Sequence, residues 1–191
     1  MKLLLDPCVA KTLVLVVLAG LSFLTMTLCS QPLRQAGLKS IIDLEVATNF
    51  GKATKLWNDI GFCQESPPEA ERKKLFLRHL ELDAWFIGCY APLMCLLCWC
   101  AADAWAHASP WMFTFGRWLA AAQLLAGVLD FVENRGLRRI IESNTITKGS
   151  LWLTGTASQL KWLILIIGSI YLVLGLVIWV IHTLRKKRRK A

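Results

Sequence analysis

The chain has 191 residues, of which 55% are hydrophobic and 18% are charged, whereas soluble domains carry about 25% charged residues. Its mean hydropathy is positive, at +0.49, and its nine tryptophans argue against disorder. The composition therefore excludes an ordinary soluble domain and favours an integral membrane protein. The net charge of +9 is concentrated in a run of basic residues, 185–190, directly after an apolar stretch. We interpret this run as an anchor to anionic lipid, so no nucleic-acid partner is expected.

Stretches that are poor in charge locate four membrane spans. A helix needs about 20 apolar residues to cross the hydrocarbon core, and the ranges 12–33, 84–104, 110–134 and 160–184 meet or approach this length. The chain is therefore expected to be all-α, an integral membrane four-helix bundle. It would form a single membrane domain over residues 1–191, with an outer loop at 34–83 and a basic tail at 185–191.

The first apolar range has a second reading, as a cleaved secretory signal. Lys2 gives it a basic start, and Thr27 and Cys29 stand at the −3 and −1 positions of a cut after Cys29. However, the apolar run is longer than the core of a usual signal, which has up to about 15 residues. Leu28 also stands where cleavage of a lipoprotein before Cys29 would need a small residue. We therefore expect this helix to be retained.

Local signals mark several helix ends. The segment 66–69, Ser-Pro-Pro-Glu, combines a capping serine, a proline at the first helical position and a glutamate three residues after the cap. A helix should begin near Pro67 and run into the second span. Ser109 and Pro110 repeat the start signal for the third span, and Gly136 is expected to end it. Apolar residues recur at roughly helical spacing over 35–61, which predicts amphipathic helices in the first loop, on the membrane face or capping the bundle.

The distribution of basic residues predicts the orientation. With four spans both termini lie on one side, which carries Lys2, Lys11 and the run 185–190, against four basic residues in the 135–148 segment. Because cytoplasmic loops are rich in lysine and arginine, the C-terminus is expected to be cytoplasmic. Six of the tryptophans fall near the ends of the predicted spans, where headgroups would lie. We interpret them as interfacial belts rather than as an aromatic ligand cage.

Antiparallel helices bring polar residues from several segments to one membrane face. Asp130, Glu133 and Asn134 share one face of the third span because they are three and four residues apart. Asp83 and Tyr90, seven apart, share a face of the second span. The expected polar cluster consists of Asp43, Glu45, Asp83, Tyr90, Asp130, Glu133, Asn134 and Lys161. Ionisable residues at membrane depth are costly, so they point into the bundle, pair or serve a function.

Three uses of this cluster remain open from the sequence. The first is structural, a network in which Lys161 and Arg135 pair with Asp130 and Glu133 and lock the helices together. The second is a site for a polar headgroup or a small ligand. The third is catalysis by paired carboxylates, with or without a divalent cation, since sites built from oxygen ligands alone have no fixed spacing in a sequence.

The same residues carry a resemblance to a family. The chain resembles a family of small, mainly bacterial, polytopic membrane proteins of unknown activity. The shared elements are an aliphatic-x-x-Glu-x-Ala segment at 42–47, a Leu-Asp-x-x-Phe-x-x-x-Tyr segment at 82–90, an Asp-x-x-Glu-Asn segment at 130–134 and the lysine Lys161. The family usually has phenylalanine where this chain has Trp162, and the cysteine content and basic tail seen here are unusual for it. The resemblance implies the four-span layout and the cluster, and it implies no reaction.

Other candidate chemistry is weaker. Cys95 and Cys98 form a C-x-x-C, but the apolar context and the lack of a second pair favour packing or acylation over zinc. Cys63 is the only cysteine expected in an outer loop, so no disulfide is predicted. His79, His107 and His182 are scattered. No cofactor or metal site is therefore predicted.

These patterns support three functional hypotheses. The first is a polytopic membrane protein that binds a lipid-like or amphipathic small molecule at the polar cluster on its outer face, or supports a larger membrane assembly. The second is an intramembrane enzyme that uses Asp83, Asp130 or Glu133 as acid, base or metal ligand. The third is a small transporter, although only Pro92 interrupts a span, and coupled transporters usually show broken helices or inverted repeats.

Overall fold

The computed structural model describes residues 7–35, 67–106, 108–143, 145 and 147–188. In this part of the chain the structure is all-α, a bundle of four helices and no strands. The helices are α1 (Pro7–Gln35), α4 (Pro67–Trp105), α5 (Pro110–Ser143) and α6 (Lys148–Arg188). Each is long and apolar enough to cross a membrane. The predicted amphipathic helices of the first loop fall mostly in 36–66, outside the described residues.

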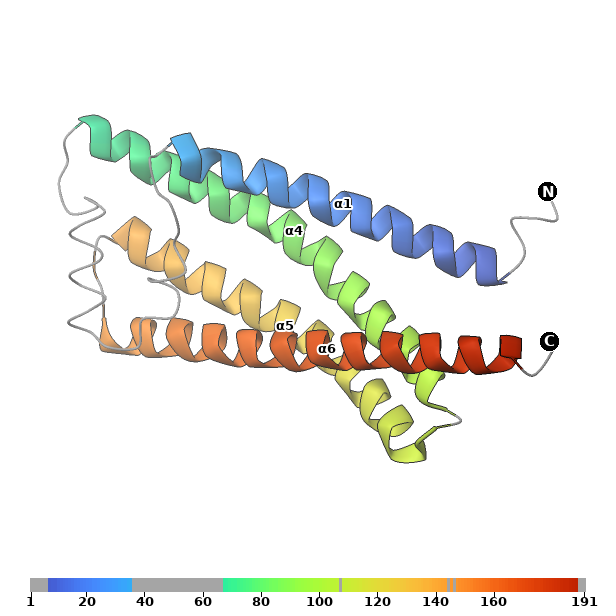
Figure 1. Cartoon of the computed structure of the whole chain (residues 1–191). Coiled ribbons are helices and arrows are strands. Elements are labelled where there is room, and N and C mark those ends of the chain that lie inside the picture. The colour runs from blue at the N-terminus through green and yellow to red at the C-terminus, as the bar shows by residue number, and fades with distance from the viewer. Residues whose placement is uncertain (1–6, 36–66, 107, 144, 146, 189–191) are drawn as a thin grey trace.

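The helices run alternately up and down, and α4 lies at the centre of the packing. It contacts α1, α5 and α6, and α5 also packs against α6. Figure 1 shows α1 lying along α4, on the far side from α6, with both chain termini at the same end. Most of α1 is therefore exposed, including Val16 at 63% and Phe23 at 74%. Side chains of this kind suit contact with lipid.

Hydrogen bonds at the helix starts show why two helices begin where they do. Ser109 accepts a bond from the backbone N–H of Met112 at 3.4 Å, which confirms the predicted cap of α5. Thr147 and Ser150 form a reciprocal capping box, with N–H to hydroxyl distances of 3.1 and 3.2 Å. This box starts α6 at Lys148, earlier than the range 160–184 suggested. The other predicted cap, Ser66, lies outside the described residues.

The prediction that Gly136 ends the third helix is wrong. α5 continues through Gly136 to Ser143. The space that a side chain would fill at Gly136 is taken by the Thr154 side chain of α6. A glycine inside a helix costs about 1 kcal/mol relative to alanine, and here it allows α5 and α6 to approach closely. The glycine therefore serves packing rather than termination.

Small residues allow close helix contacts elsewhere in the bundle. A Cβ atom at Gly127 of α5 would lie 2.7 Å from Ala91 Cβ of α4, and one at Gly175 of α6 would lie 2.9 Å from Ala101 Cβ of α4. Helices in lipid gain no hydrophobic stabilisation from association, so they depend on such close packing and on polar contacts. This bundle has both close packing at small residues and polar contacts between helices.

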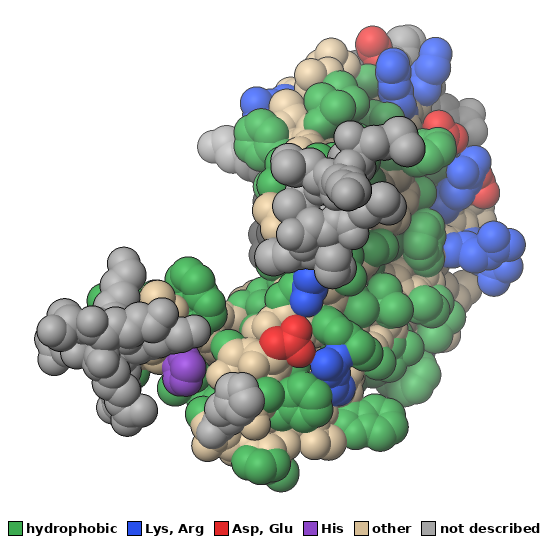
Figure 2. All heavy atoms as spheres, turned by 90° about the vertical axis from the view of Figure 1, so that its right-hand side faces the viewer, with side chains coloured by type: hydrophobic (Ala, Val, Ile, Leu, Met, Phe, Trp, Pro, Cys, Tyr) green, Lys and Arg blue, Asp and Glu red, His purple; other side chains and the backbone are tan. Residues whose placement is uncertain are grey.

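One group of charged side chains lies at the end of the bundle where α1 and α5 begin and α4 ends. Asp103 of α4 accepts ion pairs from Lys11 at 3.3 Å and from Arg117 at 3.1 Å. The Arg117 guanidinium also lies 3.5 Å from the centre of the Trp99 ring. Figure 2 shows this end, where acidic and basic side chains adjoin within a largely hydrophobic surface. The charge of Arg117, which interrupts the third predicted span, is thus paired.

Candidate functional site

The polar cluster is built on one buried face of α5. Asp130 and Glu133 point into the bundle, and Asn134 on the same face is half-buried. The helical repeat of 3.6 residues explains this grouping, since residues three and four apart lie on one face. The sequence predicts the same grouping from spacing alone.

Lys161 of α6 lies between the two acidic side chains of α5. Its Nζ is 2.8 Å from Asp130 Oδ1 and 2.7 Å from Glu133 Oε2. The side chains of Lys161, Asp130 and Glu133 are 6%, 9% and 0% exposed. The predicted ion pair between Lys161 and this acidic face is therefore confirmed, and it is a buried one.

Tyr90 of α4 provides the second hydrogen-bond partner of the Asp130 carboxylate. Its hydroxyl donates to Asp130 Oδ2 at 2.7 Å, so the two oxygens of this carboxylate have partners on two different helices. Hydrogen bonds to a charged group are stronger than neutral ones, at about 1.5–3 kcal/mol. Asp130 thereby ties α4, α5 and α6 together at one depth.

A second group of polar contacts joins α5 through α4 to α1. Asn134 donates to Asp83 Oδ2 at 2.6 Å, and the Cys29 thiol lies 3.5 Å from Asp83 Oδ1. His79 Nδ1 lies 2.8 Å from the carbonyl oxygen of Cys29, which can only accept, so Nδ1 carries a proton and donates it. The same nitrogen is 3.0 Å from the Cys29 sulfur. These contacts fix α1 against α4.

The structure brings six of the eight predicted cluster residues together in these two groups. Asp43 and Glu45 lie outside the described residues. Arg135, expected to pair with the acidic residues, is exposed, and both of its candidate partners pair with Lys161 instead. Sequence reasoning missed Cys29 and His79, and also Ser158 of α6, which lies beside Glu133. A signal existed for His79, because it stands four residues before Asp83 and so shares its helix face.

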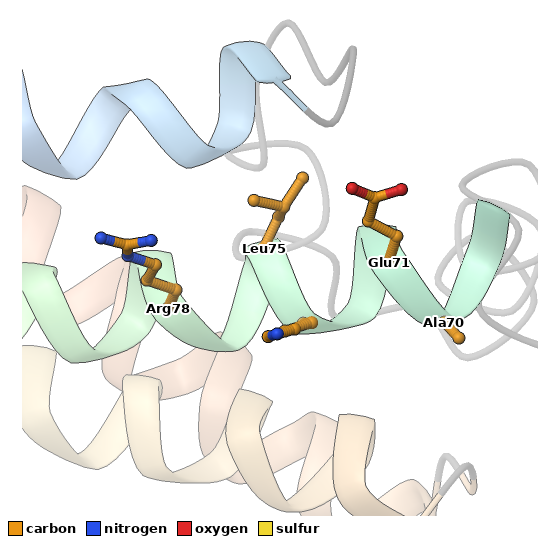
Figure 3. Close-up of a pocket in the computed structure, with 5 residues that line it drawn as sticks. Ala70, Glu71, Leu75 and Arg78 are labelled. Carbon is orange, nitrogen blue, oxygen red and sulfur yellow. The ribbon is translucent and has the colours of Figure 1, made fainter. Parts of the chain in front are cut away.

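The acidic cluster is buried, and two hollows lie elsewhere, one on α4 and one between α1 and α4. The first, of about 480 Å³, is lined by Ala70, Glu71, Lys74, Leu75 and Arg78 of α4. Figure 3 shows Glu71, Leu75 and Arg78 projecting from α4 toward the side on which α1 lies. The second, of about 310 Å³, is lined by Leu28, Gln31, Pro32, Gln35, Arg78 and Leu82. Neither hollow is lined by Asp83, Asp130 or Glu133.

Arg78 is the feature that the two hollows share, and sequence reasoning missed it. Its side chain is exposed, and the ion pairs of the described residues do not include it. A guanidinium group binds phosphate and carboxylate oxygens through paired N–H donors. The hollows can therefore receive an anionic group, whereas the acidic cluster already has its positive partner.

Comparisons of the chain with protein-family models, with curated proteins and with solved structures find no match.

Proposed function

We propose that this protein is a multi-pass membrane protein that binds an anionic, lipid-like molecule at Arg78, in the two hollows of α1 and α4. Arg78 carries the proposal, because it is exposed, lines both hollows and has no ion-pair partner among the described residues. Lys74 adds a second positive charge to the first hollow, against one negative charge from Glu71. The balance of charge there favours an anionic headgroup.

The second hollow has the lining that an amphipathic ligand requires. Leu28, Pro32 and Leu82 offer apolar surface, while Gln31 and Gln35 offer amide hydrogen bonds near the end of α1. Ligand sites commonly combine an apolar lining with a few placed polar groups. A headgroup at Arg78 with an acyl chain along Leu28 and Leu82 would use both kinds of surface.

The acidic cluster supports this site by holding the helices in place. Lys161 joins α6 to α5, Tyr90 joins α4 to α5, and Cys29 joins α1 to α4. His79 and Arg78 are neighbours in sequence, so the contact that fixes α1 also fixes the backbone that carries Arg78. In this proposal the cluster positions the binding site and does not itself hold the ligand.

The orientation of the site follows from the charge distribution. Arg78 lies toward the start of α4 and the end of α1, while the basic run 185–190 follows the opposite end of the bundle. If that run binds anionic lipid at the cytoplasmic face, Arg78 lies toward the outer face. The lipid-like ligand would thus be taken from the outer leaflet.

Binding of short-chain phosphatidylglycerol to the purified protein in detergent, measured by native mass spectrometry, tests this proposal. Arg78→Gln should weaken binding about tenfold or more, because a charge-assisted hydrogen bond contributes about 1.5–3 kcal/mol. Arg139→Gln is the matched control, since Arg139 is an exposed arginine near the same end that lines neither hollow. Equal affinities of the two variants, or equal binding of phosphatidylcholine by the unaltered protein, would refute the site.

A further inference from the structure

The buried cluster contains an unbalanced charge. Two carboxylates, Asp130 and Glu133, share the single ammonium group of Lys161, and all three side chains are less than one-tenth exposed. When all three are ionised, one negative charge is left without a counter-charge in the interior of a helical membrane bundle. Isolated charges in such surroundings are strongly disfavoured, and titratable groups there neutralise instead.

The groups that face the cluster from the neighbouring helices do not restore the balance. From α4, Tyr90 donates a hydrogen bond to Asp130, and Asp83 brings a further carboxylate, held by Asn134 of α5. α6 brings Ser158, which lies beside Glu133. On the far side of Asp83 stand the Cys29 thiol of α1 and the His79 imidazole of α4, which contact each other. Among the described residues, Lys161 is the cation that pairs with either carboxylate of the cluster.

Two buried polar atoms point to what the cluster holds. Glu133 and Ser158 are fully buried, and the Ser158 hydroxyl lies beside the Glu133 carboxyl group. Apart from each other, Glu133 Oε1 and Ser158 Oγ have no hydrogen-bond partner among the described residues. If Glu133 Oε1 carried a proton, it could donate a hydrogen bond to the Ser158 hydroxyl oxygen. Glu133 Oε2 would continue to face Lys161. A single proton thus balances the charge of the cluster, and the Ser158 hydroxyl, which can both donate and accept, can bond to the Glu133 carboxyl group that holds it.

We propose that the cluster of Asp130, Glu133 and Lys161 is a proton-binding site, which holds one exchangeable proton on Glu133 beside Ser158. A metal cation fits this position poorly. The Lys161 ammonium already lies within 2.8 Å of both carboxylates, so it would repel a second cation. Divalent cations also need about six oxygen ligands, more than Glu133 and Ser158 provide. This inference is independent of lipid binding at Arg78.

Infrared spectroscopy of the purified protein in lipid nanodiscs at neutral pH tests the proposal, because a protonated carboxyl group has a C=O band separate from those of carboxylates and amides. The unaltered protein should show this band, and transfer to D2O should shift it. Glu133→Gln and Asp130→Asn should each abolish the band, because either change leaves one carboxylate balanced by Lys161. Asp83→Asn is the matched control and should keep it.

A fourth variant tests the position of the proton. Ser158→Ala should keep the band and shift its frequency, since the group next to the protonated oxygen changes while the charge count does not. Circular dichroism and gel filtration would show that each variant is folded. The proposal is overturned if the folded protein lacks the band at neutral pH, if the band survives both Glu133→Gln and Asp130→Asn, or if Asp83→Asn removes it.

Discussion

Replacing Lys161 by methionine isolates the contribution of the buried ion pairs. Methionine keeps most of the length of the side chain and removes the ammonium group, so Asp130 and Glu133 lose the cation at 2.8 and 2.7 Å. An exposed ion pair would matter little, at about 0–1 kcal/mol. Here the three side chains are 6%, 9% and 0% exposed, so solvent cannot replace the lost partner. Stranding a buried charge costs about 3–5 kcal/mol, and we expect a loss of this size.

The assay is unfolding by sodium dodecyl sulfate in mixed micelles, followed by circular dichroism. Lys161→Met should shift the transition strongly, and the triple variant that adds Asp130→Asn and Glu133→Gln should recover more than half of the loss, because no carboxylate is then stranded. Lys148→Met provides a control on the same helix, since Lys148 is exposed. If Lys161→Met is no worse than Lys148→Met, or if the triple variant is less stable than Lys161→Met alone, the ion pairs do not hold the bundle together.

Two further predictions concern packing and orientation. Gly127→Ala should lower the free energy of unfolding in the same assay by about 1–3 kcal/mol, because the new Cβ would lie 2.7 Å from Ala91 Cβ. Gly88→Ala is the control and should leave stability equal or raised, because open space surrounds Gly88. Equal effects of the two changes would contradict this packing. Reporter fusions after Ala191 and within 62–68 should report from the cytoplasm and from outside, respectively, and two fusions reporting from one side would rule out an arrangement of four spans.

The acidic cluster could be predicted because its geometry is local to one hairpin. Asp130, Glu133 and Asn134 fall on one face of a helix by spacing alone, and Lys161 follows on the next antiparallel helix at a matching depth. Arg135 could have been excluded by the same rule. At about 3.6 residues per turn, it lies on the opposite side of α5 from Glu133, and the structure leaves it exposed.

The second hollow beside Arg78 could not be predicted, because it depends on how α1 crosses α4. A single exposed arginine near the start of a helix has no signature in a sequence. Gly136 is a second case in which a contact between helices could not be predicted from the local sequence. A glycine late in a helix commonly ends it, but here the tertiary contact with Thr154 determines the outcome. Local rules located the helices and the acidic face, while contacts between helices determined where a ligand could enter.

The polar contacts form one connected series from α1 to α6, and this links the cluster to the hollows. Cys29 contacts Asp83, Asp83 accepts from Asn134, and the adjacent Glu133 pairs with Lys161. Lipid offers α1 as much apolar contact as α4 does, so the polar contacts and not hydrophobic burial decide where α1 sits. Leu28 and Pro32 of α1 line the second hollow on either side of Cys29 in the sequence. Asp83 therefore contacts the helix that forms one wall of that hollow, and Asn134 joins Asp83 to the helix that carries the acidic cluster.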